Sequence, residues 1–266
     1  MNNRLTPLED AFPRRTNPLL VTGIVAGDPF LEATREYMDV VVEAGADVIE
    51  LIVPFSDPAY DGPVVRRACK RAMSEKVSWD GIEEMIADFR GGDDETPLIV
   101  SSYFNRVLAR GLQRCAEGLA DAGVDAVRVV DLPAEEAQEF KSELEQREMS
   151  LIQTIAPSTT KERFRRLEKE ASGLLVWTGH CGAEVTMDLS KFQDRLRDLR
   201  QYTSLPIVAS MNIESGEDAA EIARSAQGVL VESALAWLIE GMGSNVEERI
   251  EVFVADLRVS LDAIDE

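Results

Sequence analysis

The chain has 266 residues, 45% of them hydrophobic, which is long for one ordinary domain but normal for a single α/β barrel. With 28 basic and 49 acidic residues its net charge is −21, which makes it a poor partner for nucleic acid, whose phosphates must be neutralised on binding. We find no apolar run of eighteen residues and no charged-then-apolar leader. We therefore expect a protein that neither spans a membrane nor is exported.

The kinds of basic residue and the cysteines indicate an environment. Only six of the 28 basic residues are lysine, and an acid-rich, lysine-poor surface suits concentrated salt, where self-repulsion is screened. This favours a halophilic source organism over an ordinary acidic enzyme. Cys69, Cys115 and Cys181 are dispersed, odd in number and without metal-ligand spacing. They fit a reduced, cytoplasmic location.

Short apolar runs alternate with longer amphipathic segments along the whole chain. Near-continuous hydrophobicity over so few residues is typical of strands buried on both faces of a parallel sheet. The predicted strands are Leu20–Ala26, Asp47–Val53, Pro97–Tyr103, Ala126–Leu132, Ser150–Ala156, Gly173–Thr178, Pro206–Met211 and Gly228–Glu232. The predicted helices include Leu31–Ala44, Asp80–Arg90, Leu112–Ala122, Ala134–Arg147, Lys161–Ala171, Ser190–Tyr202, Gly216–Ser225, Leu235–Gly241 and Val246–Ala263.

Eight strand–helix units close most simply into a (β/α)₈ TIM barrel of the α/β class. Gly45 and Gly123 lie where a helix end needs a left-handed residue before the next strand. Without a linker or a low-complexity stretch, residues 1–266 are predicted to form one domain. Residues 1–17 are a polar lead-in, with a helix around Leu8–Phe12 that caps the barrel floor.

Two acids stand out where the second strand ends, the end of a barrel that carries the active site. Glu50 lies near the end of the strand and, if Val48 points inward, alternation points Glu50 inward as well. A carboxyl group among apolar side chains has a raised pKa and can act as both acid and base. A buried structural glutamate bonded to backbone donors is an equal alternative. Asp61 alone reads as a turn residue in Asp-Gly-Pro.

The wider segment favours a catalytic role for both acids. Residues 50–63 read ELIVPFSDPAYDGP, which resembles the signature of the tryptophan synthase α subunit family. Further matches are AGDP at 26–29, AGAD at 44–47, YFN at 103–105 and DLPAEE at 131–136. The resemblance extends over nearly the whole chain from about residue 8.

The resemblance implies cleavage of indole-3-glycerol phosphate to indole and glyceraldehyde 3-phosphate, without a metal or an organic cofactor. Glu50 would protonate the indole ring carbon and take the proton of the side-chain hydroxyl. Asp61 would stabilise the positive charge that develops on the ring nitrogen. The family also docks on a pyridoxal-phosphate β subunit, through loops that here include Asp57 and Asn105.

The match fails where the family binds the substrate phosphate. Backbone N–H groups after strands six, seven and eight bind it there, and glycines allow its close approach. The three glycines fall on Val185, Asn212 and Glu232, whereas Gly182 and Ser233 match. On strand ends and loops, the candidate substrate-binding residues are Tyr103, Thr178, His180, Gly182, Asn212, Glu232 and Ser233. His180, the single histidine, lacks a zinc-site spacing, so no metal is expected.

Glu232 is the most consequential of these departures. Two like charges about 4 Å apart repel by about 4 kcal/mol at an effective dielectric near 20, which disfavours a phosphate beside an inward Glu232. The alternative is an outward Glu232 that pairs with an arginine. Three functions stay open: a divergent α subunit, a paralogue that uses the same acid pair on a non-phosphorylated substrate, and a non-catalytic barrel that binds a partner. Arg66, Arg67 and Arg71 are expected to form a solvated helix face with nearby acids.

Overall fold

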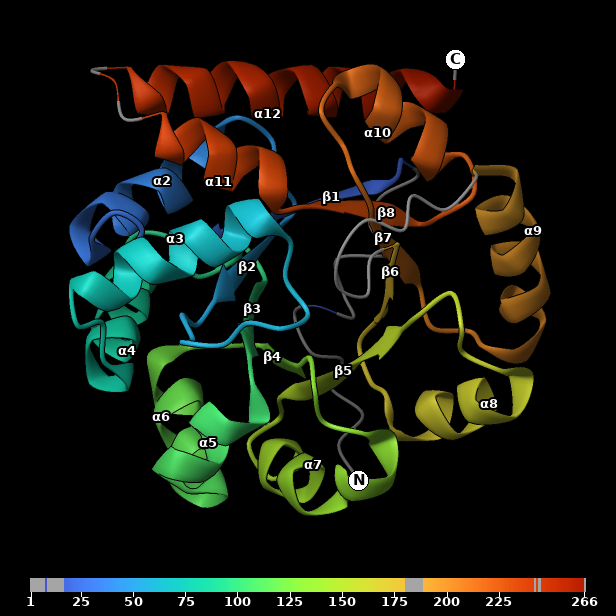
Figure 1. Ribbon diagram of the computed structural model, residues 1–266, viewed down its shortest axis with the longest axis horizontal. Coiled ribbons are helices and arrows are strands. Elements are labelled where there is room, and N and C mark those ends of the chain that lie inside the picture. Colours follow the sequence, from blue (N-terminus) through green and yellow to red (C-terminus); the bar gives the residue numbers. More distant parts are fainter. Residues whose placement is uncertain (1–7, 9–16, 180–188, 242, 244, 266) are drawn as a thin grey trace.

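The computed structural model describes residues 8, 17–179, 189–241, 243 and 245–265. Eight parallel strands form a closed barrel in sequence order, and helices surround it (Figure 1). The strands are β1 (Leu19–Val25), β2 (Val48–Ile52), β3 (Leu98–Ser102), β4 (Ala126–Val129), β5 (Ser150–Ile155), β6 (Leu175–Thr178), β7 (Ile207–Ser210) and β8 (Gly228–Val231). The last strand pairs with the first, which confirms the predicted TIM barrel.

All eight predicted strands are present, but most are shorter than their apolar runs. The fourth run extends to Leu132, whereas β4 ends at Val129 because the Leu132 N–H bonds back to the Val129 carbonyl in a turn. Beyond β4, Val130 and Leu132 line a cavity instead of extending the sheet. Gly45 and Gly123 have φ values of +105° and +93°, as the helix-end prediction requires.

The helices form a ring around the sheet. They are α2 (Leu31–Glu43), α3 (Pro63–Ser74), α4 (Trp79–Arg90), α5 (Phe104–Arg110), α6 (Leu112–Ala122), α7 (Gln138–Glu145), α8 (Lys161–Glu170), α9 (Leu189–Leu199), α10 (Gly216–Ala223), α11 (Ser233–Glu240) and α12 (Val246–Asp262). The predicted set omitted α5, a helix of seven residues that directly follows β3. No helix among the described residues is long and apolar enough to cross a lipid bilayer.

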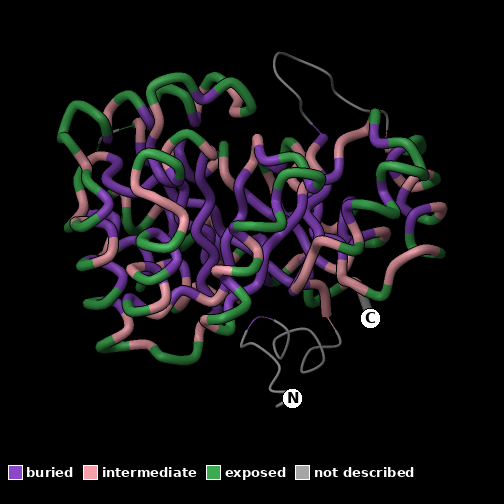
Figure 2. The backbone as a smooth tube through the Cα atoms, turned by 90° about the horizontal axis from the view of Figure 1, so that it is seen from below, coloured by how far each residue is buried: buried purple, intermediate pink, exposed green. Residues whose placement is uncertain are grey.

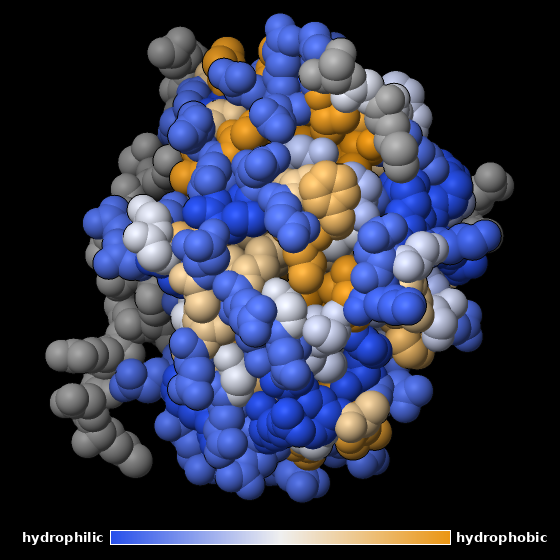
Figure 3. Space-filling view, turned by 90° about the vertical axis from the view of Figure 1, so that its left-hand side faces the viewer, coloured by the Kyte–Doolittle hydropathy of each residue, from blue (hydrophilic) through white to orange (hydrophobic). Residues whose placement is uncertain are grey.

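Two large apolar layers hold the barrel together, and a smaller apolar cluster joins β1 and β2 to α3 and α11. The larger lies between the strands and the helices, and includes the fully buried rings of Phe89, Phe140, Phe164, Trp177 and Phe192. Figure 2 shows the buried chain at the centre of the molecule and the exposed chain around it. Figure 3 shows one flank of the molecule, where hydrophilic residues predominate.

The second layer fills the lower part of the barrel interior, at the N-terminal ends of the strands. Its members are Leu8, Leu19, Val21, Val48, Ile99, Ala126, Ile152, Leu174, Val176, Val208 and Leu230. Burying each large apolar side chain stabilises the fold by about 1.5–3 kcal/mol. Leu8 closes this layer from below, and the rest of the predicted capping helix lies outside the described residues.

Candidate active site

The upper part of the barrel interior is polar. Side chains alternate along a strand, so the residue two positions after each inward apolar residue also points inward. Paired residues in the parallel ladder agree: Gly23 pairs with Glu50, Ser101 with Arg128, and Thr178 with Ser210. The inward residues at this level are Gly23, Glu50, Ser101, Arg128, Thr154, Thr178, Ser210 and Glu232. Every one is polar, charged or glycine.

Glu50 is fully buried on β2, as its inward prediction requires. The Arg128 Nε–H donates to Glu50 Oε1 at 2.7 Å, and Oε2 has no hydrogen-bond partner among the described residues. Burial raises the pKa of Glu50 to about 7, against the lowering effect of Arg128, and Glu232 raises it further. The carboxyl group is therefore poised to give and take a proton near neutral pH.

Asp61 lies on the loop between β2 and α3, where Tyr103 contacts it. The Tyr103 hydroxyl donates to Asp61 Oδ2 at 2.7 Å and accepts the Tyr60 N–H at 3.1 Å. The Tyr103 ring stacks on Phe55, with ring centroids 4.9 Å apart. Burial raises the pKa of Asp61 to about 6, while the Tyr103 hydrogen bond lowers it. Asp61 is thus mostly ionised at neutral pH and fixed in direction.

Arg66 ties the Asp61 loop to α3. Its Nε–H donates to the Asp61 carbonyl at 2.8 Å, and Nη2 donates to the Ala59 carbonyl at 3.1 Å. These bonds start from an exposed side chain, so part of the expected solvated face also fixes the loop. The backbone of Asp61 is therefore held from α3, and its carboxylate is held by Tyr103, which directly follows β3.

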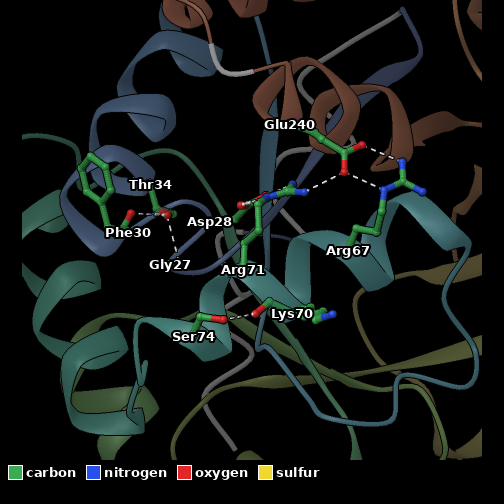
Figure 4. Close-up of polar contacts among 9 residues, drawn as sticks. All are labelled: Gly27, Asp28, Phe30, Thr34, Arg67, Lys70, Arg71, Ser74 and Glu240. Carbon is green, nitrogen blue, oxygen red and sulfur yellow. Dashed lines mark hydrogen bonds and ion pairs between the residues drawn. The ribbon is translucent and has the colours of Figure 1, made fainter.

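Arg71 does pair with acids, as predicted, but its side chain is largely buried rather than solvated (Figure 4). Its guanidinium binds both oxygens of the fully buried Asp28 at 2.7 Å, and its Nη1 lies 3.0 Å from Glu240. Exposed Arg67 binds the same Glu240 at 2.6 Å. A buried aspartate needs such a partner. The cluster joins the end of β1 to α3 and α11, the helices that follow Asp61 and Glu232.

Glu232 points into the barrel, which rules out the outward alternative. It does pair with an arginine, but with the inward Arg128: Nη2 lies 3.0 Å from Glu232 Oε1. The Ser210 hydroxyl donates to Oε2 at 2.8 Å. A Cβ atom on Gly23 would come within 2.5 Å of Glu232 Cγ, so a side chain at Gly23 would displace it.

The other candidate residues fall into separate places. Asn212 and Ser233 line one cavity of about 450 Å³ beside β7 and β8. Thr178 lines another of about 390 Å³, together with Tyr60 and Thr154. The predicted partner-interface residues, Asp57 and Asn105, are exposed. The candidates His180 and Gly182, together with Cys181 and Val185, lie outside the described residues.

Arg128 was missed by the sequence reasoning. It stands in the run Ala-Val-Arg-Val-Val, whose four apolar residues predict a buried strand. A single arginine inside a buried strand is itself a signal, because arginine is almost never buried without a partner. The Glu50 and Glu232 carboxylates raise the pKa of Arg128 above its ordinary value, because together they outweigh its burial. Arg128 stays protonated.

The described residues show no group of three or more His, Cys, Asp or Glu side chains placed to hold a metal ion. What they bring together is a buried carboxyl group inside a TIM barrel and a second carboxylate on the adjacent loop. This arrangement is that of a TIM-barrel enzyme that uses acid–base catalysis, with its site at the C-terminal ends of the strands.

Comparison with known proteins identifies the family. A family model described as tryptophan synthase alpha chain matches residues 11–262, and the chain belongs to this family. The tryptophan synthase alpha chain of Xanthomonas euvesicatoria is 41% identical over 248 residues, covering 91% of this chain and 92% of that one. That of Xanthomonas campestris is 37% identical over 266 residues, covering 98% of each.

Solved structures agree. The crystal structure of tryptophan synthase subunit alpha from Legionella pneumophila superposes with a TM-score of 0.92 at 29% identity, covering 98% of this chain and all of that one. Tryptophan synthase from M. tuberculosis, in its aminoacrylate-bound form, gives a TM-score of 0.86 at 26% identity, covering 96% and 99%. The predicted family membership is confirmed.

Proposed function

We propose that the chain is a carbon–carbon lyase that cleaves indole-3-glycerol phosphate to indole and glyceraldehyde 3-phosphate. The observation that carries this proposal is the acid pair: Glu50, fully buried on β2, and Asp61, oriented by Tyr103 on the loop that follows. The environment of this acid pair suits acid–base catalysis at neutral pH, and the chain that carries it belongs to the tryptophan synthase alpha chain family.

The reaction divides between the two acids. Glu50 delivers a proton to the ring carbon that bears the side chain, and Asp61 stabilises the positive charge that then forms on the ring nitrogen. Glu50, now ionised, takes the proton of the hydroxyl group on the adjacent side-chain carbon. The carbon–carbon bond breaks, its electron pair returns to the ring, and the hydroxyl-bearing carbon becomes the aldehyde. Glu50 ends protonated, as it began.

We extend the proposal to a partner and a location. A tryptophan synthase β subunit is the expected partner, and exposed Asp57 and Asn105 are the residues expected to face it. The buried free thiols of Cys69 and Cys115 fit the reduced cytoplasm. The net charge of −21 fits a halophilic source.

The test is indole release from indole-3-glycerol phosphate by the purified chain, alone and with the β subunit of the same organism, at low and high salt. We expect release that the β subunit stimulates and that Glu50→Gln abolishes. Turnover that is absent under every condition, from a chain shown to be folded, would contradict the proposal.

A second candidate function rests on the inward carboxylate of Glu232. A paralogue would use the same acid pair on a substrate that lacks a phosphate at this end. Inorganic phosphate and glyceraldehyde 3-phosphate are the probes, in titrations of the native chain and of a variant with glycine at positions 185, 212 and 232. Phosphate affinity that appears only in the variant favours the paralogue, whereas tight binding by the native chain excludes it.

A further inference from the structure

Arg128 takes no part in the acid–base steps above, yet it lies at the centre of the polar layer. It is 6% exposed and reaches two carboxylates, one on β2 and the other directly after β8. Its Nε donates to Glu50 at 2.7 Å, and its Nη2 lies 3.0 Å from Glu232. A guanidinium group presents its donors in a rigid planar fork, so two contacts fix both its position and its plane.

Glu232 in turn is fixed from two sides. One oxygen binds Arg128 at 3.0 Å and the other accepts the Ser210 hydroxyl at 2.8 Å. Gly23 leaves the space that the Glu232 side chain occupies, because a Cβ atom there would lie 2.5 Å from its Cγ. Four inward residues, from β1, β4, β7 and the end of β8, thus form one connected support.

This support acts on one oxygen of Glu50. Oε1 accepts from Arg128, whereas the buried Oε2 has no hydrogen-bond partner among the described residues. A buried carboxylate oxygen without a donor is costly and is uncommon outside functional sites. Held by Oε1, the carboxyl group has a fixed plane and presents Oε2 as the oxygen that exchanges protons.

We propose that Arg128 is a positioning residue for Glu50: it holds Oε1, leaves Oε2 for the substrate, and is itself held by Glu232 and Ser210. The inference rests on the proposed role of Glu50 as the acid and base of the reaction. In this arrangement Glu232 does not face the substrate as a bare charge, because the guanidinium of Arg128 lies between the two carboxylates.

The charges around Glu50 allow a test that distinguishes a positioning role of Arg128 from a purely structural one. Arg128 from β4 lowers the pKa of Glu50, Glu232 from the end of β8 raises it, and the Ser101 hydroxyl from β3 lowers it. Asp61, on the loop after β2, is the other carboxylate coupled to Arg128. Neutralising Arg128 and neutralising Glu232 must therefore shift the titration of Glu50 in opposite directions.

The first experiment measures kcat and kcat/KM against pH for indole-3-glycerol phosphate. Arg128→Gln is expected to lower kcat about a hundredfold. The limb of the pH profile that reports the ionisation of Glu50 should also move to higher pH, by about one pH unit or more. Glu232→Gln should move that limb downward and lower kcat less, because the amide oxygen still accepts from Arg128. Shifts in the same direction, or none, would overturn the proposal.

Arg128→Lys separates charge from geometry. Lysine keeps the positive charge but cannot reproduce the planar fork. The pH profile should stay near that of the native chain, while kcat stays at least about tenfold low and KM changes little. Full recovery of kcat would show that charge alone suffices and would overturn the positioning role. This variant and Glu232→Gln decide the matter even if Arg128→Gln does not fold.

A measurement without substrate keeps the inference apart from the proposed function. The titration of the Glu50 carboxyl carbon is followed by ¹³C NMR in glutamate-labelled protein and assigned by its loss in Glu50→Gln. The same opposite shifts are expected. If they occur and the native chain does not cleave indole-3-glycerol phosphate, the proposed substrate is wrong and the Arg128 support stands. If the native chain cleaves indole-3-glycerol phosphate but the variants leave the titration of Glu50 unchanged, the role of Arg128 is wrong and the proposed function stands.

Discussion

The lower and upper parts of the barrel interior are built on the same eight strands but from opposite chemistry. Along β2, Val48 belongs to the apolar layer, and Glu50, two residues further, belongs to the polar one. On β3 the same step leads from Ile99 to Ser101. The lower layer stabilises the fold by burying apolar side chains. The upper layer buries polar and charged side chains instead, and these can take part in the reaction.

The comparison also shows how the upper layer is tolerated. Charges taken out of water need partners with good geometry, or the fold loses stability. Two carboxylates, Glu50 and Glu232, share one Arg128, so the cation is well satisfied, and within the described part of the chain Glu50 Oε2 has no hydrogen-bond partner. That incomplete satisfaction is where the upper layer departs from a purely structural network.

Removing the acid tests the upper layer most directly. Glu50→Gln keeps the size of the side chain and removes its proton exchange, so kcat should fall by about 10²–10⁴-fold. Indole release in single-turnover and steady-state assays measures the loss. Exposed Glu43→Gln, at the end of α2, is the matched control and should leave kcat unchanged. Retention of most activity in Glu50→Gln would mean that the polar layer does not carry the chemistry.

The lower layer should show the reverse behaviour. Leu174→Ala empties space in the apolar layer, where Leu174 is 1% exposed, and should lower the free energy of unfolding by about 2–5 kcal/mol. Well below the melting temperature kcat should not change. The surface change Leu108→Ala, at a leucine that is 51% exposed, is the control and should cost less than about 0.5 kcal/mol. Urea denaturation measures both.

The sequence predicted the parts of this comparison that follow from period and motif. Alternation from Val48 placed Glu50 inside, and the eight apolar runs fixed the number of strands. Asp61 was identified by its motif alone, since in isolation it is a turn residue. These features depend on residues close together in the chain.

What the sequence did not predict depends on pairs far apart in the chain. Arg128 and Glu50 are 78 positions apart, and Arg128 and Glu232 are 104 apart. No local pattern links them, so the direction of Glu232 could not be fixed and Arg128 was read as part of an apolar run. The contact between Arg71 and Asp28, 43 positions apart, was missed for the same reason.

The contact between Tyr103 and Asp61 tests how far the upper layer depends on orientation. Tyr103→Phe keeps the ring stacked on Phe55 but removes a hydrogen bond to a charged group, which is worth about 1.5–3 kcal/mol. We expect kcat/KM to fall about tenfold. The Tyr103 hydrogen bond lowers the pKa of Asp61, so its loss should raise that pKa and narrow the pH profile from the acid side.

Phe55→Leu is the companion variant for Tyr103→Phe. It weakens the stacking and leaves the hydroxyl group in place, so the acid limb of the profile should keep its position. An equal shift of the acid limb in both variants would assign the effect to packing rather than to the hydrogen bond.

The smallest expected effect concerns how burial of the Glu50 carboxyl group changes the free energy of unfolding with pH. Its pKa is raised from 4.5 to about 7 in the folded chain, so between these values the folded state binds more protons than the unfolded state. The contribution of Glu50 to stability is therefore lost as the pH rises from about 4.5 through about 7. Glu50→Gln removes this titration, while Arg128 keeps Glu232 as its partner.

The free energy of unfolding of Glu50→Gln, relative to the native chain, should therefore rise by about 1–3 kcal/mol between pH 5.5 and pH 8. Chemical denaturation across this range measures the difference, and exposed Glu43→Gln should show a flat one. A difference that falls with pH would show that the ion pair with Arg128 outweighs burial. The upper layer would then stabilise the fold as the lower layer does, and the division between the two parts of the barrel would be one of chemistry only.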